Sequence, residues 1–530
     1  MGSTLWLGGC VRVTIAARQS HLARHQAFEV AEALKNKNSN LEIEFHFRES
    51  MGDKNLQNPL WEMPERGVFT EDFVAGLLNR EFDIVVHSWK DLPVETREGL
   101  ELIACLPRAD QRDLLLIKKS SLLKDFSENK LTIFSSSPRR IYNLKNLLPS
   151  LLPLQIKEVQ FQSVRGNIPT RIRKMLESEG VDGLVLAKAA LDRLMSPRIG
   201  AEWEELRLLL KSYLAECEWL VLPLIENPTA AAQGAIVIES LEGREDLKQL
   251  FKKVNCYKTF SAVEKERQTL KKFGGGCHLA LGISVINLST PNENNFQKET
   301  MIEVDKNPSL TNELLSLRGQ TPEGLQLNEL QFSYEGPKFL LDEVSVVQEH
   351  QKIRKPIEIN FQELHSAHGL FVSRFEAWPE TYQTHLGQII WTAGLHTWKK
   401  LAAKGVWVHG TSESLGYGIP NLDFLGSNNY KKSFLRLTHA DAIRSLTDVG
   451  TYQIIDENGI SIDENKKIFF WKSGKMAEKY FKKFPWLKNK FHATGFGESN
   501  EILKELIGNE FNKLFLFLNS DEFLKTVVRH

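Results

Sequence analysis

The sequence predicts an α/β protein of several globular domains, and three features of the 530-residue chain lead to this fold class. Its length corresponds to about three or four domains at roughly 150 residues each. Strand and helix patterns alternate from residue 11 to 87, and the same rhythm returns from 130 to 187. A faint internal repeat occupies part of the C-terminal region. Such alternation is typical of mainly parallel sheets covered by helices.

The elements of the first lobe follow from periodicity and capping. Residues 11–17 are apolar like a strand, and 20–36 carry helical periodicity with Ser20 placed as the N-cap. The further predicted elements are strand 41–47, helix 71–79 and strand 83–87. A polar stretch with prolines, 52–67, lies among them and is either a mobile lid beside a site or an ordinary surface excursion.

A second lobe and a smaller third region follow along the chain. The second lobe has the predicted order strand 130–134, helix 138–148, strand 158–161, helix 170–178 and strand 183–187. The third region begins with a helix over 261–273, turns at three glycines over 274–276, and continues as a strand over 279–285. It extends to about residue 350.

The C-terminal repeat pairs Phe371-Val-Ser373 with Phe470-Trp-Lys-Ser473. Gly394 follows the serine of the first unit, and Gly495 follows the serine of the second at nearly the same spacing. Each unit is typical of a strand, turn, helix, strand, glycine turn and helix. The region is therefore predicted to contain two α/β halves.

Charge and cysteine content exclude several classes of protein. The 67 Lys and Arg residues balance 67 Asp and Glu residues, which argues against a nucleic-acid or anionic-membrane binder but allows a local basic cleft. No stretch approaches about 18 uninterrupted apolar residues, and the N-terminus lacks a basic leader. The five cysteines are scattered without a CxxC pair, so no disulfide framework and no metal site is predicted. We expect a cytoplasmic protein with reduced thiols.

Basic residues gather where predicted strands end, which is where ligands bind in sheets of this kind. These positions hold seven cations, four hydroxyls and one acid: Arg18, Lys90, Arg139, Arg140, Arg165, Arg171 and Arg193, with Ser20, Ser88, Ser136 and Ser137, and Asp91. Arginine pairs bidentately with carboxylates and phosphates, so the set favours a cleft for a polyanion over simple surface solvation. Asp91 in such a cleft would stabilise a cation or move a proton, although an aspartate after a strand is as often a helix cap.

Cys277 differs from the other cysteines in its surroundings. It follows three consecutive glycines, which allow close approach by another group, and Lys271 and Lys272 lie nearby. Basic neighbours favour the thiolate and so its nucleophilicity. A turn that presents one cysteine for permanent covalent attachment is the sharper hypothesis, because no partner acid supports a protease-type Cys-His pair.

Taken together, these motifs resemble hydroxymethylbilane synthase (porphobilinogen deaminase). The runs that carry the resemblance are Ala17-Arg-Gln-Ser20, Val86-His-Ser-Trp-Lys-Asp-Leu-Pro93, Ser135-Ser-Ser-Pro-Arg-Arg140, Arg165-Gly-Asn-Ile-Pro-Thr-Arg171, Leu191-Asp-Arg-Leu194, Ala232-Gln-Gly-Ala235 and Gly275-Gly-Cys-His278. They follow the order of the family over residues 11–285. The resemblance implies a cytoplasmic enzyme that condenses four molecules of porphobilinogen, releases ammonia, and carries a dipyrromethane cofactor bound covalently through Cys277.

The resemblance also assigns roles to single residues. It makes Asp91 the catalytic residue. The implied cofactor-binding residues are Cys277, Lys90, Ser137, Arg139, Arg140 and Arg165, and the implied substrate-binding residues are Arg18, Ser20, Ser88, Arg171, Arg193 and Arg66. One departure lies in the stretch 59–67, where the family usually has two basic residues and this chain has Glu62 and Arg66.

The C-terminal region resembles uroporphyrinogen-III synthase in part. The similar runs are Phe371-Val-Ser373, Trp391-Thr-Ala-Gly-Leu-His-Thr-Trp398, Gly405-Val-Trp-Val-His-Gly-Thr-Ser-Glu-Ser-Leu415 and Phe469-Phe-Trp-Lys-Ser-Gly474. The resemblance implies cyclisation of hydroxymethylbilane to uroporphyrinogen III. A tethered synthase would capture the hydroxymethylbilane released by the deaminase at high effective concentration. Candidate contacts are Ser373, Thr397, Ser412 and Ser473, each of which is equally an ordinary helix cap.

The resemblance implies two doubly wound lobes like those of periplasmic binding proteins, a small cofactor-cysteine domain and a C-terminal synthase-like domain. The expected bounds are 11–115 with 211–250, 116–210, 251–352 and 353–530. One alternative is a deaminase with a non-catalytic C-terminal module. Another is an anion receptor, which would need neither the glycine turn nor Cys277. We expect a monomer that acts on porphobilinogen, without a nucleic-acid or membrane partner.

Overall fold

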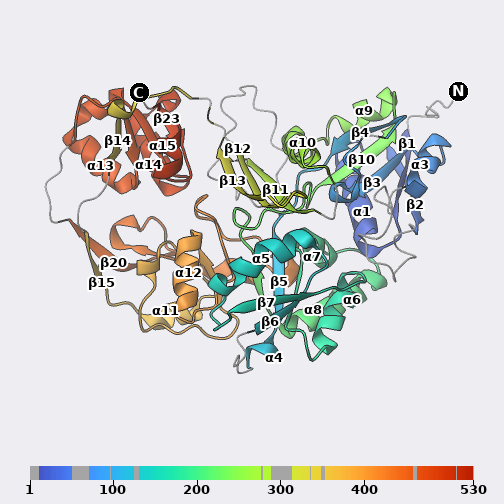
Figure 1. Cartoon of the computed structure of the whole chain (residues 1–530), viewed down its shortest axis with the longest axis horizontal. Helices are drawn as coiled ribbons and strands as arrows, with labels where there is room; N and C mark the ends of the chain where they lie inside the picture. The colour runs from blue at the N-terminus through green and yellow to red at the C-terminus, as the bar shows by residue number, and fades with distance from the viewer. Residues whose placement is uncertain are drawn as a thin grey trace.

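The computed structural model consists of two α/β lobes, a small antiparallel domain and a C-terminal module of two halves (Figure 1). The lobes lie at the right and lower centre of Figure 1, and the module lies at the left. The structure describes residues 11–49, 71–95, 97–123, 130–275, 279–287, 313–332, 334, 336–347, 352–456, 462–508 and 510–528.

Lobe 1 is built on a five-stranded sheet of order β2-β1-β3-β10-β4. Its strands are β1 (Val11–Arg18), β2 (Leu41–Arg48), β3 (Ile84–Ser88), β4 (Leu100–Cys105) and β10 (Ile236–Leu241). Its helices are α1 (His21–Lys37), α3 (Glu71–Leu78), α9 (Glu245–Phe251) and the 3-10 turn η2 (Trp89–Asp91). Strand β10 alone runs antiparallel to its neighbours. Ser20 caps α1 as predicted, because its Oγ accepts a hydrogen bond from the Ala23 amide.

Lobe 2 repeats this plan in the order β7-β6-β8-β5-β9. Its strands are β5 (Asp113–Lys118), β6 (Lys130–Phe134), β7 (Glu158–Gln162), β8 (Gly183–Ala187) and β9 (Cys217–Val221). Its helices are α4 (Lys119–Leu122), α5 (Pro138–Leu151), α6 (Ile168–Glu177), α7 (Lys188–Met195) and α8 (Ala201–Ala215). Here β5 is the reversed strand, so it takes the place that β10 takes in lobe 1.

Two connectors join the lobes. We call 106–112 the first connector and 222–235 the second connector. They lie side by side, since the Ala109 amide donates to the Gly234 carbonyl at 3.3 Å. The chain returns to lobe 1 only at β10, whereas we expected the return near residue 211, and β9 pairs with β5 in lobe 2. The sequence of a short strand such as β9 carries no local signal of which sheet it joins.

The small domain packs helix α10 (Tyr257–Lys272) against an antiparallel sheet. Its strands are β11 (Ala280–Asn287), β12 (Glu313–Gln320) and β13 (Gln326–Phe332). The expected end of this domain near residue 352 needs correction. Strand β14 (Val344–Val347) already pairs in parallel with β21 (Ile468–Trp471) of the C-terminal module.

The C-terminal module has two sheets, as its sequence repeat predicts. The first has the order β15-β20-β19-β16-β17-β18, and the second has the order β14-β21-β22-β23. The strands not yet bounded are β15 (Lys352–Pro356), β16 (Gly369–Val372), β17 (Ile389–Thr392), β18 (Gly410–Thr411), β19 (Phe434–His439), β20 (Asp448–Asp456), β22 (Phe491–Thr494) and β23 (Leu514–Leu516). The helices are α11 (Phe361–Ser366), α12 (Leu395–Ala403), α13 (Gly474–Lys483), α14 (Glu498–Ile507) and α15 (Ser520–Lys525).

The two repeat units have the same strand pairing but differ in the segment that connects the paired strands. Strand β16 pairs in parallel with β17 in the first unit, and β21 pairs with β22 in the second. The second unit has α13 between its strands, whereas the first has only the 3-10 turn η4 (Phe375–Ala377). The expected helix fails there because Pro379 follows closely and disfavours helical geometry at Trp378.

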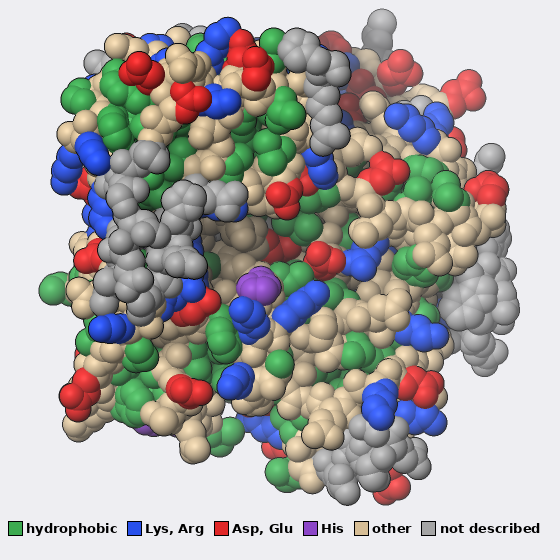
Figure 2. Space-filling model, turned by 60° about the vertical axis from the view of Figure 1, so that its left-hand side comes forward, with side chains coloured by type: hydrophobic (Ala, Val, Ile, Leu, Met, Phe, Trp, Pro, Cys, Tyr) green, Lys and Arg blue, Asp and Glu red, His purple; other side chains and the backbone are tan. Residues whose placement is uncertain are grey.

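The C-terminal module and lobe 2 share one hydrophobic core. Leu147 and Leu151 of α5 belong to the same buried cluster as Trp398 and Leu401 of α12. The Trp398 indole N–H also donates to the Leu151 carbonyl at 2.9 Å. The face in Figure 2 shows acidic and basic side chains interspersed around a central hollow. The module is therefore packed into the N-terminal half and is not held by a linker alone.

Candidate active site

A pocket opens at the carboxyl ends of β1 and β3 in lobe 1. Its lining includes Arg18 at the end of β1, Ser88 at the end of β3, and Asp91 in η2. Strands β1 and β3 are parallel neighbours, so their carboxyl ends bring these residues to one edge of the sheet. Its polar lining also includes His87 of β3, Ser20 as the N-cap of α1, and Gln26 within that helix.

The serine hydroxyls of this pocket already have protein partners. Ser20 Oγ accepts from the Ala23 amide at 3.4 Å, and Ser88 Oγ accepts from Gln26 Nε2 at 3.2 Å. Each hydroxyl retains its own proton, which can be donated to an anion. Gln26 is a pocket residue that the sequence interpretation missed, because on periodicity alone it is one more residue of an amphipathic helix.

The basic residues of lobe 2 converge on a carboxylate that the sequence interpretation also missed. Asp113 is fully buried at the start of β5 and accepts from Arg139 Nη1 at 2.8 Å and from Arg140 Nη2 at 2.7 Å. Asn227 Nδ2 and Gln233 Nε2 of the second connector donate to it at 3.2 and 2.9 Å. The available signal was a charged residue followed by four apolar residues of one strand, since a charge is costly to bury without partners.

The charge balance around Asp113 favours its ionised form. Burial by itself would raise the pKa of the Asp113 carboxyl, but the guanidinium groups of Arg139 and Arg140 overcome this and hold the pKa well below its usual range. Burial in turn lowers the pKa of Arg139, and the adjacent charge of Arg140 adds to that effect. One carboxylate is thus shared by two arginines, which leaves excess positive charge.

Lys90 of lobe 1 lies within electrostatic range of Arg139, Arg140 and Asp113 of lobe 2. Burial lowers the pKa of the Lys90 ammonium group, and the positive charges of Arg140 and Arg139 lower it further, against the opposing effect of Asp91 and Asp113. The charge of Lys90 in η2 is thus coupled electrostatically to the charges at the start of α5.

Arg171 and Arg165 extend the positive region within lobe 2. Burial and the charges of Arg140 and Arg165 lower the pKa of Arg171 to about 10. Arg171 Nε donates to the Gly166 carbonyl at 2.6 Å, which fixes the side chain beside the loop before α6. Like charges held together without enough acid are costly in the free protein, and an anionic ligand relieves that cost.

Three other expected site residues have different surroundings. Arg193 is buried and spans the lobes, with Nη2 donating to the Gly234 carbonyl at 3.0 Å and Nε donating to Glu29 at 3.4 Å. Arg139 is also buried and committed to Asp113 and to the Pro228 carbonyl. Both side chains thus have partners within the protein, and their ligand contacts stay predictions. Ser137 precedes α5, and its hydroxyl makes no capping hydrogen bond.

Cys277, Arg66 and Glu62 lie outside the described residues. The structure does describe the approach to Cys277, because Gly274 and Gly275 adopt φ values of +89° and +61° at the end of α10. A Cβ at Gly275 would lie 3.6 Å from Val94 Cγ2, three residues beyond Asp91. Gly275 therefore lies beside the segment that carries Asp91, and its positive φ is one that glycine adopts readily.

The four candidate hydroxyls of the C-terminal module come from both of its halves. Ser412 Oγ is buried and accepts from the Trp391 indole N–H at 3.2 Å, while Ser473 Oγ caps α13. Thr397 is buried within α12, and Ser373 is half-buried after β16. The local contacts of Ser412 and Ser473 fit the capping and packing alternative.

The two halves of the module meet at an ion pair that the sequence interpretation did not include. Glu498 of α14 pairs with Arg436 at 3.1 Å and with Arg444 at 3.0 Å, and Arg436 also pairs with Asp448 at 2.6 Å. Arg436 is buried, and its guanidinium lies 5.2 Å from the centre of the Tyr417 ring. Arginines between two α/β halves are suited to hold a ligand carboxylate if Glu498 moves away.

The arrangement in the N-terminal half has a definite chemical capacity. The pocket of lobe 1 holds Arg18 and Asp91 in its described lining, and Lys90 beside Asp91 lies within electrostatic range of Arg139 and Arg140 of lobe 2. Such a cleft can hold a ligand with several carboxylates. A single carboxylate within it can stabilise a developing cation or hold a proton. Among the described residues, no helix has the length and apolar character needed to cross a membrane.

Comparison with known proteins agrees with this chemistry. A family described as "Porphobilinogen deaminase, dipyromethane cofactor binding domain" matches residues 13–249. Porphobilinogen deaminase of Syntrophomonas wolfei is 37% identical over 265 residues, covering 50% of this chain and 78% of the relative. That of Caldicellulosiruptor saccharolyticus is 35% identical, covering 51% and 83%. A probable porphobilinogen deaminase of Methanocaldococcus jannaschii is 34% identical, covering 51% and 81%.

Solved structures match much more weakly. A periplasmic sulfonate-binding protein from Methylobacillus flagellatus is 14% identical, and the match covers 50% of this chain and 73% of that chain. Its TM-score of 0.27 is too low to support a common fold.

Proposed function

This chain belongs to the porphobilinogen deaminase family, and we propose that its N-terminal half condenses porphobilinogen into hydroxymethylbilane with release of ammonia. The reaction is a transfer step of tetrapyrrole biosynthesis. The observation that carries the proposal is the pocket that holds Arg18 and Asp91. It is supported by the mutual electrostatic influence of Lys90, Arg140 and Arg171 around it. Porphobilinogen brings an acetate and a propionate, so each added unit requires further cations.

The residues of the cleft fit the dipyrromethane cofactor of the family. The cofactor carries several carboxylates, and the lowered pKa values of Lys90 and Arg171 reflect buried positive charge that suits such a group. Lys90, Arg140 and Arg165 are the residues that would hold it, and Cys277 is the proposed point of covalent attachment. When bound, the cofactor supplies a covalent anchor and an acceptor carbon for the growing chain.

Asp91 is the proposed catalytic residue. Loss of ammonia from porphobilinogen leaves a cationic methylene-pyrrole, whose positive charge is stabilised by a nearby carboxylate. The same carboxylate can hold the proton of a pyrrole nitrogen while the new carbon–carbon bond forms. Arg18, Ser20 and Ser88 lie in the same pocket and would bind the acidic arms of the substrate. Neutral Asn at position 91 would lose both effects.

The test compares Asp91→Asn with Asp441→Asn, which makes the same chemical change at an exposed position of the C-terminal module. Consumption of porphobilinogen per cofactor-loaded molecule should fall by about 100-fold or more in Asp91→Asn and stay unchanged in Asp441→Asn. Near-normal turnover by Asp91→Asn would remove Asp91 from the mechanism. Cys277→Ala should abolish the covalent mass addition, whereas a receptor would keep its affinity for porphobilinogen.

The C-terminal module is proposed to cyclise hydroxymethylbilane to uroporphyrinogen III. The support is its pair of mainly parallel α/β sheets and the arginines of the first half that pair with Glu498 of the second. The alternative is a non-catalytic module. Incubating the full chain with porphobilinogen and separating the uroporphyrin isomers decides between them, because an active module gives type III and an inactive one gives type I. The cytoplasmic location and the monomeric state stay predictions.

A further inference from the structure

The C-terminal module contacts both connectors between the lobes. Segment 409–424, which follows α12 and consists of strand β18 and a long loop, reaches lobe 2 and the connectors at several points. At its start, the Val221 amide donates to the His409 carbonyl at 2.8 Å, just before the second connector begins. Near its end, the Phe424 amide donates to Asp192 Oδ1 at 3.0 Å.

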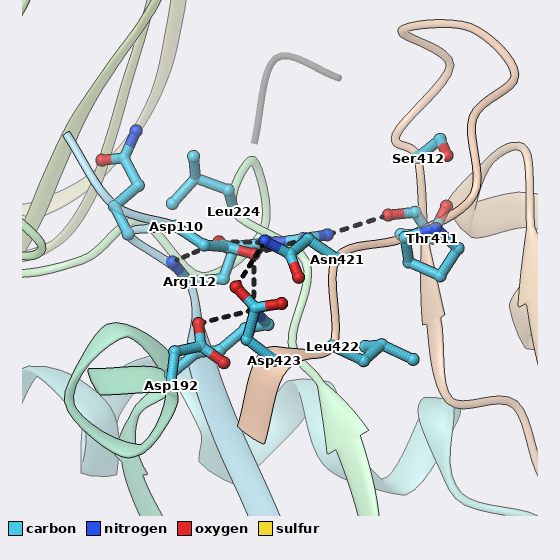
Figure 3. A network of polar contacts seen from close by, with 12 residues as sticks. Asp110, Arg112, Asp192, Leu224, Thr411, Ser412, Asn421, Leu422 and Asp423 are labelled. Carbon is cyan, nitrogen blue, oxygen red and sulfur yellow. Dashed lines mark hydrogen bonds and ion pairs between the residues drawn. The ribbon is translucent and has the colours of Figure 1, made fainter. Parts of the chain in front are cut away.

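The first connector is held through Arg112. Its guanidinium pairs with Asp110, with Nη2 at 2.7 Å from Oδ2 and Nε at 2.9 Å from Oδ1, and Nη1 donates to the Thr411 carbonyl at 3.2 Å (Figure 3). Arg112 is buried and stacks near the ring of Trp391. The next residue along the chain is Asp113, on which Arg139 and Arg140 converge, so the contact lies one residue from the carboxylate that orients the cleft.

The second connector is held through Glu413. Its carboxylate accepts from the Leu224 amide at 2.8 Å and from the Ile225 amide at 2.6 Å. The small domain binds the same segment from its carbonyl side, since Ser316 Oγ donates to the Ile225 carbonyl at 2.8 Å. Arg318 Nη1 donates to the Glu226 carbonyl, also at 2.8 Å. The second connector is thus held between two domains.

The backbone of the loop is strained where it makes this contact. Glu413 and Ser414 have φ values of +50° and +65°, which are uncommon for residues other than glycine. The Glu413 amide donates to Thr411 Oγ1 at 3.1 Å, which helps to hold this conformation. Glu413 is itself buried. A strained backbone that aims a buried carboxylate at a connector indicates a constraint beyond packing.

We propose that Glu413 is a positioning residue of the porphobilinogen-condensing reaction, which sets the relative placement of the two lobes by fixing the second connector. The inference rests on the proposed function of the N-terminal half. The ligand cations come from both lobes, with Arg18 and Lys90 in lobe 1 and Arg140 in lobe 2. Substrate binding by cations of both lobes depends on how the lobes are placed relative to each other. Small displacements of these binding groups strongly weaken the affinity for substrate.

A positioning role makes a kinetic prediction that simple destabilisation does not. Partial unfolding lowers the number of active molecules and so the apparent kcat, but it leaves KM unchanged. Misplaced lobes weaken substrate binding in every folded molecule, so KM rises. The second connector also exchanges its amide hydrogens faster, because the Leu224 and Ile225 amides lose the carboxylate that accepts from them.

The experiment uses the full chain with its cofactor loaded and counted by intact mass. Assays are made at pH 8, above the pKa of about 7 to which burial raises the Glu413 carboxyl, so that it is ionised in the wild type. The variants are Glu413→Ala and Glu413→Gln, with Glu380→Ala as the matched control at an exposed position of the module. Hydrogen exchange of the peptide covering 222–226 is measured in parallel.

The expected KM for porphobilinogen rises by about 10-fold or more in Glu413→Ala, by less in Glu413→Gln, and not in Glu380→Ala. Exchange at Leu224 and Ile225 should accelerate in the same order. If Glu413→Ala does not fold, Glu413→Gln decides, because it keeps the shape and one acceptor oxygen. An active wild type with unchanged KM in the folded Glu413 variants overturns this inference alone. A wild type that consumes no porphobilinogen overturns the proposed function.

Discussion

Asp113 lies beneath Arg140 and accepts two hydrogen bonds from its guanidinium, at 2.7 Å from Nη2 and 3.1 Å from Nε. Arg140 Nη1 donates to the Val185 carbonyl at 3.2 Å, so the whole guanidinium is fixed by lobe 2. A carboxylate that is fully buried and bound by two arginines orients both of them before any ligand arrives. The cleft is therefore organised in the free protein.

Replacing Asp113 should damage stability and activity together. Asp113→Asn removes the charge that compensates Arg139 and Arg140, and breaking a buried ion pair on one side typically costs about 3–5 kcal/mol. We expect a lower midpoint in urea unfolding and loss of porphobilinogen turnover in the molecules that fold. Asp441→Asn, at an exposed site, should match the wild type in both measurements. An unchanged midpoint for Asp113→Asn would show that another group compensates the arginines.

Arg171 and Arg173 offer a matched pair on helix α6. Arg171 is half-buried beside Arg140 and Arg165, whereas Arg173 is exposed. Arg171→Gln should raise KM for porphobilinogen by about 10-fold or more, because a ligand cation is lost. It should leave the melting temperature equal or higher, since a crowded positive charge is removed. Arg173→Gln should change neither quantity, and a reduced KM in Arg171→Gln would contradict its assignment to the cleft.

His492 should make the stability of the C-terminal module depend on pH. Burial lowers its folded-state pKa to about 4, whereas an unfolded histidine has a pKa of about 6.5. The unfolded state therefore binds the extra proton between these values, so stability is lost as the pH falls from about 6.5 to about 4. The loss from this residue is on the order of 3 kcal/mol, at about 1.4 kcal/mol per pH unit.

Melting of the wild type and of His492→Gln across pH 4–7 measures this effect. His492→Gln should have a shallower slope, since Gln does not titrate in this range. His385→Gln is the control, because His385 is an exposed histidine of the same module. Equal slopes in the wild type and His492→Gln would assign the acid sensitivity to other groups.

Trp398 should link the stability of the C-terminal module to that of lobe 2. Trp398→Ala opens a cavity in the shared core and removes the hydrogen bond to the Leu151 carbonyl, at a cost of about 3–5 kcal/mol. Faster hydrogen exchange is expected in both α12 and α5. Trp486→Ala, at a half-buried tryptophan beside the core of the second half, should leave α5 protected. Faster exchange confined to α12 would mean that the two parts unfold independently.

Much of the secondary structure was predictable because it depends on local patterns. The predicted strand 11–17 and helix 20–36 appear as β1 (Val11–Arg18) and α1 (His21–Lys37). The sheet to which β9 belongs was not predictable, because its short strand pattern suits either lobe. The predicted helix after Ser373 was wrong, since Pro379 outweighs the similarity of the repeat units.

The sequence by itself determined which residue types stand at the strand ends, and so the positive character of the site with Asp91 within it. Only the tertiary structure decided that Arg139 and Arg140 pair with Asp113. The same holds for the hydrogen bonds between Glu413 and the second connector. Periodicity and caps depend on neighbours a few residues apart. Partners separated by tens or hundreds of residues meet only through sheet order and shared cores, which no local pattern encodes.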